Sequence, residues 1–121
     1  MPDKVYRTAI YCRLSREDGD KVESNSIASQ RAICEDYIAR HDDLELVCEP
    51  FVDDGYSGVS FNRPQFKKLE EAIRKGALDC IVVKDLSRFS RNYIDGGRYI
   101  EKIFPQLGIR FIAINDAYDS L

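Results

Sequence analysis

Four apolar runs follow one another along this chain, separated by segments with the periodicity of amphipathic helices. The runs cover residues 5–14, 44–52, 78–83 and 109–115. Between them, residues 26–41, 62–76 and 94–107 repeat apolar side chains every three or four positions. Strands that alternate with helices over short loops form a mainly parallel sheet covered by helices on both faces. The order therefore predicts an α/β fold, a three-layer, mainly parallel sheet of about four to five strands flanked by helices.

Cap and proline signals set the expected helix boundaries. Ser24 or Asn25 can cap the first helix, and Asn62 is the expected N-cap of the second, with Pro64 in its first turn. Pro105 should shorten or kink the last turn of the third helix, because proline lacks the backbone N–H that a helix interior requires.

The length of 121 residues suits one domain with a single core, spanning residues 1–121. No apolar run approaches the roughly 20 residues that span a bilayer, and the N-terminus lacks the apolar segment of a signal peptide. We therefore expect a cytoplasmic protein without a membrane partner. The chain stops soon after the fourth run, so we expect a fragment of a longer protein.

The cysteines give no metal-site pattern. None forms a C-x-x-C pair, and all fall within expected strands or helices, so we expect buried free thiols and no metal or cofactor. They are Cys12, Cys34, Cys48 and Cys80.

The end of the first run carries the polar residues of most chemical interest. Alternate side chains of a strand share a face, so Tyr11, Arg13 and Ser15 lie together, while Ile10 and Cys12 point the other way into a core. A serine hydroxyl beside a guanidinium suits attack on a phosphate, because the nucleophile needs activation and the phosphate oxygens need cations.

The carboxyl ends of parallel strands meet at one edge of a sheet, where α/β sites form. Those ends carry Arg13, Ser15, Asp53, Asp54, Lys84 and Asp85. Arg88 and Arg91 follow, and being three apart they share a face if that segment is helical, while Arg63 could turn toward the same edge. One hydroxyl among several arginines suits phosphoryl transfer, since arginine grips phosphate oxygens with two parallel hydrogen bonds.

Three ordered blocks resemble the serine site-specific recombinases of the resolvase/invertase family. Tyr11-x-Arg13-x-Ser15 with Ser26-Ile27-x-x-Gln30-Arg31 resembles the opening of that family. The second block is Asp54-Gly55-Tyr56-Ser57-Gly58 with Asn62-Arg63-Pro64. The third, residues 84–92, resembles the arginine-rich block of the large serine recombinases of mobile elements. The resemblance covers nearly the whole chain.

The resemblance implies a resolvase-like catalytic domain for DNA integration or excision. Ser15 would attack a DNA phosphodiester and form a phosphoserine bond to the 5′ end, without metal or ATP. The phosphate would be held by Arg13, Arg63, Arg88 and Arg91. Tyr11, Gln30 and Asp54 would shape the pocket. The partners implied are double-stranded DNA and further copies of the protein, as dimers or tetramers, through a long helix and DNA-binding domains that this chain lacks.

One position departs from the family pattern. Small resolvases usually carry an aspartate, proposed to transfer a proton, where this chain has Ser87, and the nearest carboxylate here is Asp85. Both are therefore candidate participants, and the general acid is open. The net charge of −3 is also unusual for a free-standing DNA-binding domain, so other segments should supply most of the grip on DNA.

Plainer interpretations stay open for single residues. Ser15 can be a loop serine or a helix cap, Arg13 can pair with Glu17, and Gln30 can be a purely structural amide. For Asp53 a role in an Asx-type turn is favoured, and Arg88 with Arg91 can form a solvated basic face.

Other functions are less consistent with the pattern. A metal-dependent nuclease could use Asp53, Asp54 and Asp85, but the nearby arginines favour a metal-free site. The phosphatase spacing C-x5-R from Cys34 to Arg40 falls within an expected helix. The alternative from another class is a catalytically silent domain that serves protein–protein assembly.

Overall fold

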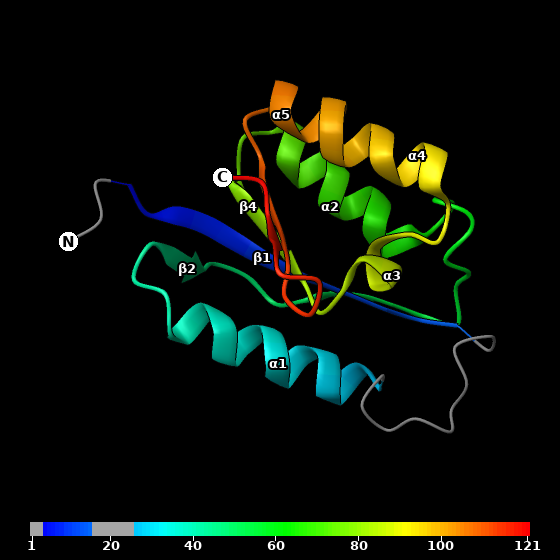
Figure 1. Cartoon of the computed structure of the whole chain (residues 1–121), viewed down its shortest axis with the longest axis horizontal. Helices are drawn as coiled ribbons and strands as arrows, with labels where there is room; N and C mark the ends of the chain where they lie inside the picture. The colour runs from blue at the N-terminus through cyan, green and yellow to red at the C-terminus, as the bar shows by residue number, and fades with distance from the viewer. Residues whose placement is uncertain (1–3, 16–25) are drawn as a thin grey trace.

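A computed structural model describes residues 4–15 and 26–121 and shows an α/β fold with three layers (Figure 1). The strands are β1 (Tyr6–Leu14), β2 (Leu44–Leu46), β3 (Phe51–Asp54), β4 (Cys80–Val83), β5 (Arg110–Ala113) and β6 (Tyr118–Asp119). The helices are α1 (Ile27–Ala39), α2 (Pro64–Arg74), α3 (Leu86–Phe89), α4 (Tyr93–Arg98) and α5 (Phe104–Gln106). The predicted fold class is confirmed.

The sheet has the order β2-β1-β4-β5-β6, with β3 pairing β1 off this path, and all pairs are parallel except β5 with β6. Within the described residues six strands form it, against the four to five expected. The expected strand 44–52 is two strands, because the chain leaves β1 after Leu46 and returns at Phe51, just after Pro50, which has no N–H to donate. The short β6 is the other addition.

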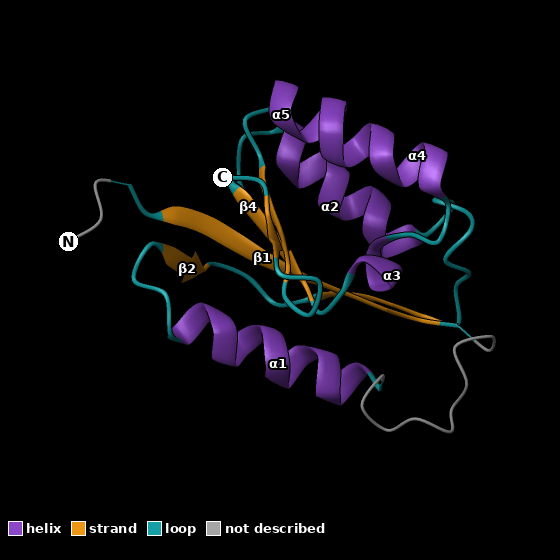
Figure 2. Cartoon of the chain, viewed as in Figure 1, coloured by secondary structure: helices purple, strands orange, loops and turns teal. Residues whose placement is uncertain are grey.

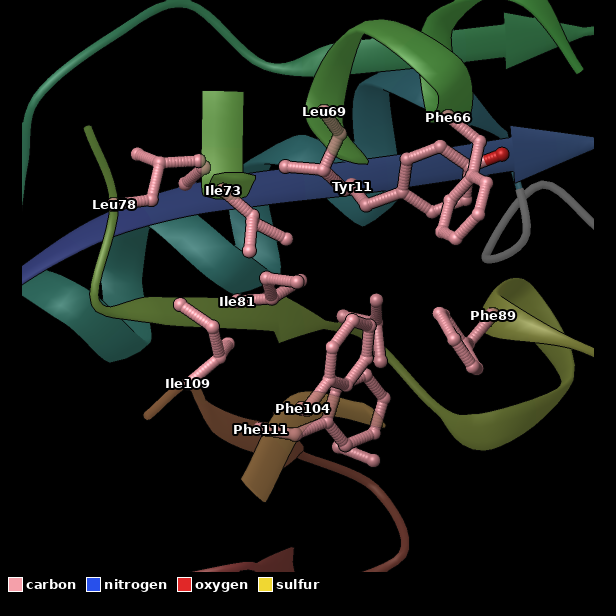
Figure 3. Packing of buried hydrophobic residues seen from close by; sticks show 13 residues of the cluster. Tyr11, Phe66, Leu69, Ile73, Leu78, Ile81, Phe89, Phe104, Ile109 and Phe111 are labelled. Atoms are coloured by element: carbon pink, nitrogen blue, oxygen red, sulfur yellow. The ribbon is translucent and has the colours of Figure 1, made fainter. Parts of the chain in front are cut away.

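Helices cover both faces of the sheet, α1 one face and α2, α4 and α5 the other (Figure 2). Strand alternation therefore sends side chains into two cores. In β1, Ile10 and Cys12 pack toward α1, whereas Tyr11 joins Phe66 and Leu69 of α2 (Figure 3). The two faces of β1 diverge as expected, but both are buried, and Tyr11 is not at the surface.

Two helix starts differ from expectation. Ser26 caps α1 by accepting from Ser29 N, whereas Ser24 and Asn25 lie outside the described residues. Arg63, not Asn62, occupies the N-cap position of α2 and makes no capping bond with its side chain. The signal that selected Asn62 was local, whereas the acceptor for the first turn of α2 comes from β3.

The third expected helix forms, but it is not uniform. A π-helical turn at Tyr99–Ile103 joins α4 to α5, and the N–H of Phe104 bonds the carbonyl of Tyr99. Pro105 follows directly and cannot donate to the preceding turn. The irregularity therefore lies just before the proline instead of in the last turn.

Three of the cysteines are buried free thiols as expected, but Cys48 is exposed. Burial raises the pKa of Cys12 and of Cys80 to about 12 each, so these thiols stay neutral. Cys48 lies between β2 and β3, in the segment that the sequence assigned to a continuous strand.

An ion pair joins the start of β1 to the residue before β4, at the edge of the sheet opposite the arginine-rich segment. Asp79 accepts from the backbone N–H of Arg7 at 3.0 Å and from its guanidinium at 2.9 and 3.0 Å. The hydrogen bond from the Arg7 side chain lowers the pKa of Asp79 from 3.8 to about 2, against the opposing effect of partial burial.

This pair predicts a pH dependence of stability. Because the pKa of Asp79 is lower in the folded protein, the pair stabilises the fold above the ordinary value of 3.8 and loses that contribution as the pH falls toward 2. In urea unfolding, the parent should exceed Asp79→Asn in stability at about pH 5, and the difference should shrink toward pH 2. A difference that does not vary with pH would contradict this assignment.

Candidate functional site

The candidate nucleophile lies at the carboxyl end of the central strand. Ser15 follows the last residue of β1 and is 7% exposed, and Arg13, two residues earlier, is fully buried. Next to this end, the N–H groups of Gly55 and Tyr56 donate to the carbonyl of Leu14 and hold the loop after β3 against it. Glu17, the alternative partner of Arg13, lies outside the described residues.

Two buried arginines are locked together beside Ser15. The Nε of Arg13 donates to the carbonyl of Arg88 at 3.1 Å, and Nη1 of Arg88 donates to the carbonyl of Arg13 at 3.0 Å. Arg13 also donates to the carbonyls of Tyr56 and Ser87. Arg88 is 2% exposed, which rules out a solvated basic face for this residue. Because each guanidinium bonds the main chain of the other arginine, the end of β1 and the helix α3 are fixed relative to each other.

Packing and capping hold α3 in place. Phe89 is fully buried and packs against Phe111 and Phe66, with ring centroids 5.0 and 5.8 Å away (Figure 3). At the other end of α3, the carboxylate of Asp85 accepts from the N–H of Arg88 at 3.2 Å. The helix ends at Phe89, so Arg88 and Arg91 do not share a helical face, contrary to the conditional expectation.

Asp85 and Ser87 form a pair next to Arg88. The Ser87 hydroxyl donates to Asp85 at 2.5 Å and accepts from Nη2 of Arg88 at 3.2 Å. Burial alone would raise the pKa of Asp85, but the Ser87 hydrogen bond and the charges of Arg88 and Lys84 lower it overall. A carboxyl group with a lowered pKa is a poor proton donor at neutral pH, so Asp85 is suited to accept from Ser87.

Arg63 is buried deeper than the sequence suggested. It is fully buried, and its guanidinium donates to the phenol oxygen of Tyr11 at 3.3 Å and to the carbonyl of Phe89 at 2.7 Å. It also donates to the carbonyls of Ser57, Ser60 and Gly58. In this structure, the described contacts of Arg63 are therefore with protein groups that shape the site, and its contact with a phosphate stays a prediction.

Gln30 is fully buried, and its side-chain amide is paired within the fold. From α1, its side-chain amide accepts from the N–H of Arg13 at 3.1 Å and donates to the carbonyl of Arg13 at 2.9 Å. The amide thereby pairs with the end of β1 as a neighbouring strand would. The interpretation of Gln30 as a structural amide is supported by these two bonds, and a role for it in the pocket stays a prediction.

Two other candidates lie at the periphery. Arg91 is exposed, and its backbone N–H donates to the carbonyl of Gly58 at 2.8 Å. Asp54 is exposed at the end of β3, whereas its neighbour Asp53 is 1% exposed and accepts from the Tyr11 hydroxyl at 2.9 Å. The Asx-turn interpretation of Asp53 is wrong. Asp53 lies two residues after Phe51 and therefore on the same face of β3. These two residues pair with Arg13 and Tyr11 of β1, respectively, and this alternation was the signal that could have identified Asp53 as a site residue.

Gly58 occupies a position where a larger residue would displace a site arginine. A Cβ on Gly58 would lie 2.7 Å from Nη2 of Arg13 and 2.9 Å from Cγ of Arg91. Arg13 cannot move aside without breaking its bonds to main-chain carbonyls. We expect Gly58→Ala to lower the free energy of unfolding by about 1–3 kcal/mol, as overpacking does.

A matched glycine provides the control for this measurement. A Cβ on Gly97 of α4 would meet no atom within 4 Å, so Gly97→Ala should leave the stability unchanged or raise it slightly. Urea unfolding of both variants would compare them. Equal stabilities would show that the contact between Gly58 and Arg13 is not restrictive.

Taken together, the end of β1 carries Ser15 in the same region as the buried Arg13 and Arg88, and this combination suits recognition of an anion. Within residues 4–15 and 26–121, no group of three or more His, Cys, Asp or Glu side chains is arranged to hold a metal ion. No helix in the described parts of the chain is long and apolar enough to span a membrane.

Comparisons with known proteins agree with this geometry. The family model described as "Resolvase, N terminal domain" matches residues 8–121. A putative DNA recombinase of Bacillus subtilis (strain 168) is 31% identical over 110 residues, which are 91% of this chain but 21% of that protein. The chain thus spans about a fifth of the length of that curated relative.

Solved structures show the same fold. The N-terminal catalytic domain of TP901-1 integrase is similar with a TM-score of 0.81 and 28% identity, over 94% of this chain and 81% of that one. A resolvase family site-specific recombinase from Streptococcus pneumoniae is similar with a TM-score of 0.74 and 28% identity, over 97% of this chain and 76% of the other.

Proposed function

This chain belongs to the resolvase N-terminal domain family, the catalytic-domain family of serine site-specific recombinases, and on that basis we propose that it cleaves and rejoins DNA with Ser15 as the nucleophile. The Ser15 oxygen attacks the phosphorus of a backbone phosphodiester, and the bond from phosphorus to the 3′ oxygen breaks. The 5′ end is then held as a phosphoserine ester. Ser15 loses a proton and the 3′ oxygen gains one, so the step balances.

Rejoining reverses the same chemistry. A 3′ hydroxyl attacks the phosphoserine, restores the phosphodiester and returns the hydroxyl to Ser15. Because the phosphoserine ester retains the energy of the cleaved bond, the proposed reaction needs no ATP. The arginines are proposed to stabilise the charge on the phosphate oxygens, the role that a metal ion has in other phosphoryl-transfer enzymes.

The observation that carries this proposal is the position of Ser15 beside the interlocked Arg13 and Arg88. Both arginine residues are at most 2% exposed and their guanidinium groups are held by main-chain carbonyls, so their charge is preorganised near the end of β1 that carries Ser15. Preorganised donors stabilise the charge that develops on phosphate oxygens in the transition state. We propose that Arg13, Arg63, Arg88 and the exposed Arg91 bind the scissile phosphate, and that Tyr11, Gln30 and Asp54 shape its pocket.

The proposed partners are double-stranded DNA carrying a recombination site and further copies of the protein. The net charge of −3 gives this chain little general affinity for DNA. We therefore propose that residues 1–121 act as a catalytic domain, while other parts of a longer protein supply most of the DNA contact and the assembly into dimers or tetramers.

Covalent trapping tests the proposal. The full-length protein is incubated with DNA that carries its crossover site, the reaction is stopped in denaturant, and the DNA-linked residue is mapped by mass spectrometry. A 5′ phosphate on Ser15 is expected. A protein that recombines this DNA without a Ser15 adduct would overturn the assignment, and one that only associates with its own copies would support the assembly function instead.

A further inference from the structure

Asp53 is a buried carboxylate placed between β1 and α2. It is 1% exposed and lies opposite Arg13 in the parallel register of β1 and β3. Its Oδ2 accepts from the hydroxyl of Tyr11 and from the N–H of Phe66, both at 2.9 Å, and its Oδ1 accepts from the N–H of Gln65 at 3.0 Å. A buried carboxylate is tolerated only when such donors satisfy it, so its contacts define a fixed geometry.

The contacts of Asp53 with the N–H groups of Gln65 and Phe66 set the start of α2. Arg63 at the N-cap position has an extended backbone, with φ −130° and ψ 127°, and its side chain caps nothing. The first N–H groups of the helix donate to Asp53 instead. A negative charge at a helix N-terminus is also favourable to the helix dipole. Asp53 therefore fixes the position from which the Arg63 side chain leaves the backbone.

The contact of Asp53 with the Tyr11 hydroxyl connects it to the Arg63 guanidinium. A guanidinium only donates, so the Tyr11 oxygen accepts from Nη1 of Arg63 at 3.3 Å and its hydrogen is directed to Asp53. Burial raises the pKa of Tyr11, so the hydroxyl keeps its proton. Asp53 thus constrains Arg63 in two ways. It fixes the first turn of α2, which follows Arg63, and it orients the Tyr11 hydroxyl that accepts from the Arg63 guanidinium.

Arg63 passes this constraint to the site. It donates to the carbonyl of Gly58, where an added Cβ would touch Arg13, and to the carbonyl of Phe89, the residue after Arg88. The loop against Arg13 and the end of α3 are both held by this one guanidinium.

We propose that Asp53 is a positioning residue for DNA cleavage, which acts through Tyr11 and Arg63 on the placement of Arg13 and Arg88. This inference rests on the proposed function. It differs from a simple capping role for Asp53, which would affect the stability of α2 and leave the cleavage rate of the folded protein unchanged.

The test compares Asp53→Asn, Tyr11→Phe and the double variant in the full-length protein. Adduct formation on Ser15 is measured in a single turnover at saturating DNA, together with DNA affinity and urea unfolding. We expect each single change to slow adduct formation by about 10- to 100-fold, because small displacements of phosphate-binding groups are costly. The DNA affinity should change by less than about threefold, since most of the DNA contact is made elsewhere.

The double variant distinguishes positioning from capping. If Asp53 acts through Tyr11, the double variant should be about as slow as the slower single variant, because residues that act as a unit are not additive. Rates that multiply, or an Asp53→Asn rate within about threefold of the parent, would overturn the proposal. If Asp53→Asn does not fold, Tyr11→Phe decides, and a rate within about threefold of the parent would overturn it as well.

Asp79→Asn is the matched control. It makes the same change in a carboxylate that accepts backbone and side-chain N–H groups, at the opposite edge of the sheet. It should lower stability and leave the adduct rate unchanged. A parent protein without any Ser15 adduct would overturn the proposed function and this inference together, whereas a fast Asp53→Asn variant would overturn this inference alone.

Discussion

Replacing Ser15 by alanine is expected to abolish covalent attachment to DNA, because the substitution removes the hydroxyl that we propose attacks the phosphodiester. The side chain is small and 7% exposed, so its loss should change the free energy of unfolding by no more than about 1 kcal/mol, the usual contribution of one hydrogen bond. The measurement is the yield of the protein–DNA adduct in denaturant, with urea unfolding of the same sample.

A second serine provides the control for Ser15→Ala. The hydroxyl of Ser120 accepts from the N–H of Phe111 at 2.8 Å, at the edge of the sheet away from Ser15. Ser120→Ala should show a similar stability change and full adduct formation. An adduct in Ser15→Ala would show that Ser15 is not the nucleophile of this reaction. Absence of the adduct in both variants would show that its loss in Ser15→Ala is not specific to Ser15.

Replacing Arg88 by lysine is expected to slow cleavage by at least about 100-fold, the effect typical of losing a preorganised donor to a transition-state oxygen. The Arg88 guanidinium bonds the carbonyl of Arg13 with Nη1 and the Ser87 hydroxyl with Nη2. A lysine ammonium cannot hold both groups in this geometry and also grip a phosphate with two parallel bonds. The single-turnover rate of adduct formation measures the effect.

Stability has to be measured with the same variant, because Arg88 is buried. The loss of its hydrogen bonds should lower the free energy of unfolding by about 1–3 kcal/mol. Arg40→Lys is the control, since Arg40 is exposed and pairs with Asp36 of the same helix. Cleavage by Arg88→Lys within about tenfold of the parent, when the protein is folded, would remove Arg88 from the phosphate-binding group.

Local sequence signals predicted the fold because they act within one element. Apolar periodicity located the helices and the buried strands, and strand parity correctly separated Ile10 and Cys12 from Tyr11. The strand ends also brought Arg13, Ser15 and Asp85 into one region, because parallel strands end at a common edge.

Errors arose where a partner from another element decides the outcome. Asparagine is a favoured N-cap residue, and Asn62 was therefore expected to cap α2, yet the first turn of α2 donates to Asp53 of β3. The sequence placed Tyr11 and Arg63 near the carboxyl edge of the sheet but gave no sign that both are fully buried. Neither the remote capping nor this burial has a signature within a single segment of sequence.

The sequence by itself determined where the three main helices and the apolar runs lie and that they make a mainly parallel sheet, because backbone periodicity and turn chemistry are local properties. Only the tertiary structure decided how those residues are held. The reciprocal bonds of Arg13 and Arg88, and the contacts from Asp53 through Tyr11 to Arg63, join residues far apart in the chain. Such contacts require atoms to be placed to within a few tenths of an ångström. Packing sets these positions, and the spacing of residues in the sequence does not encode them.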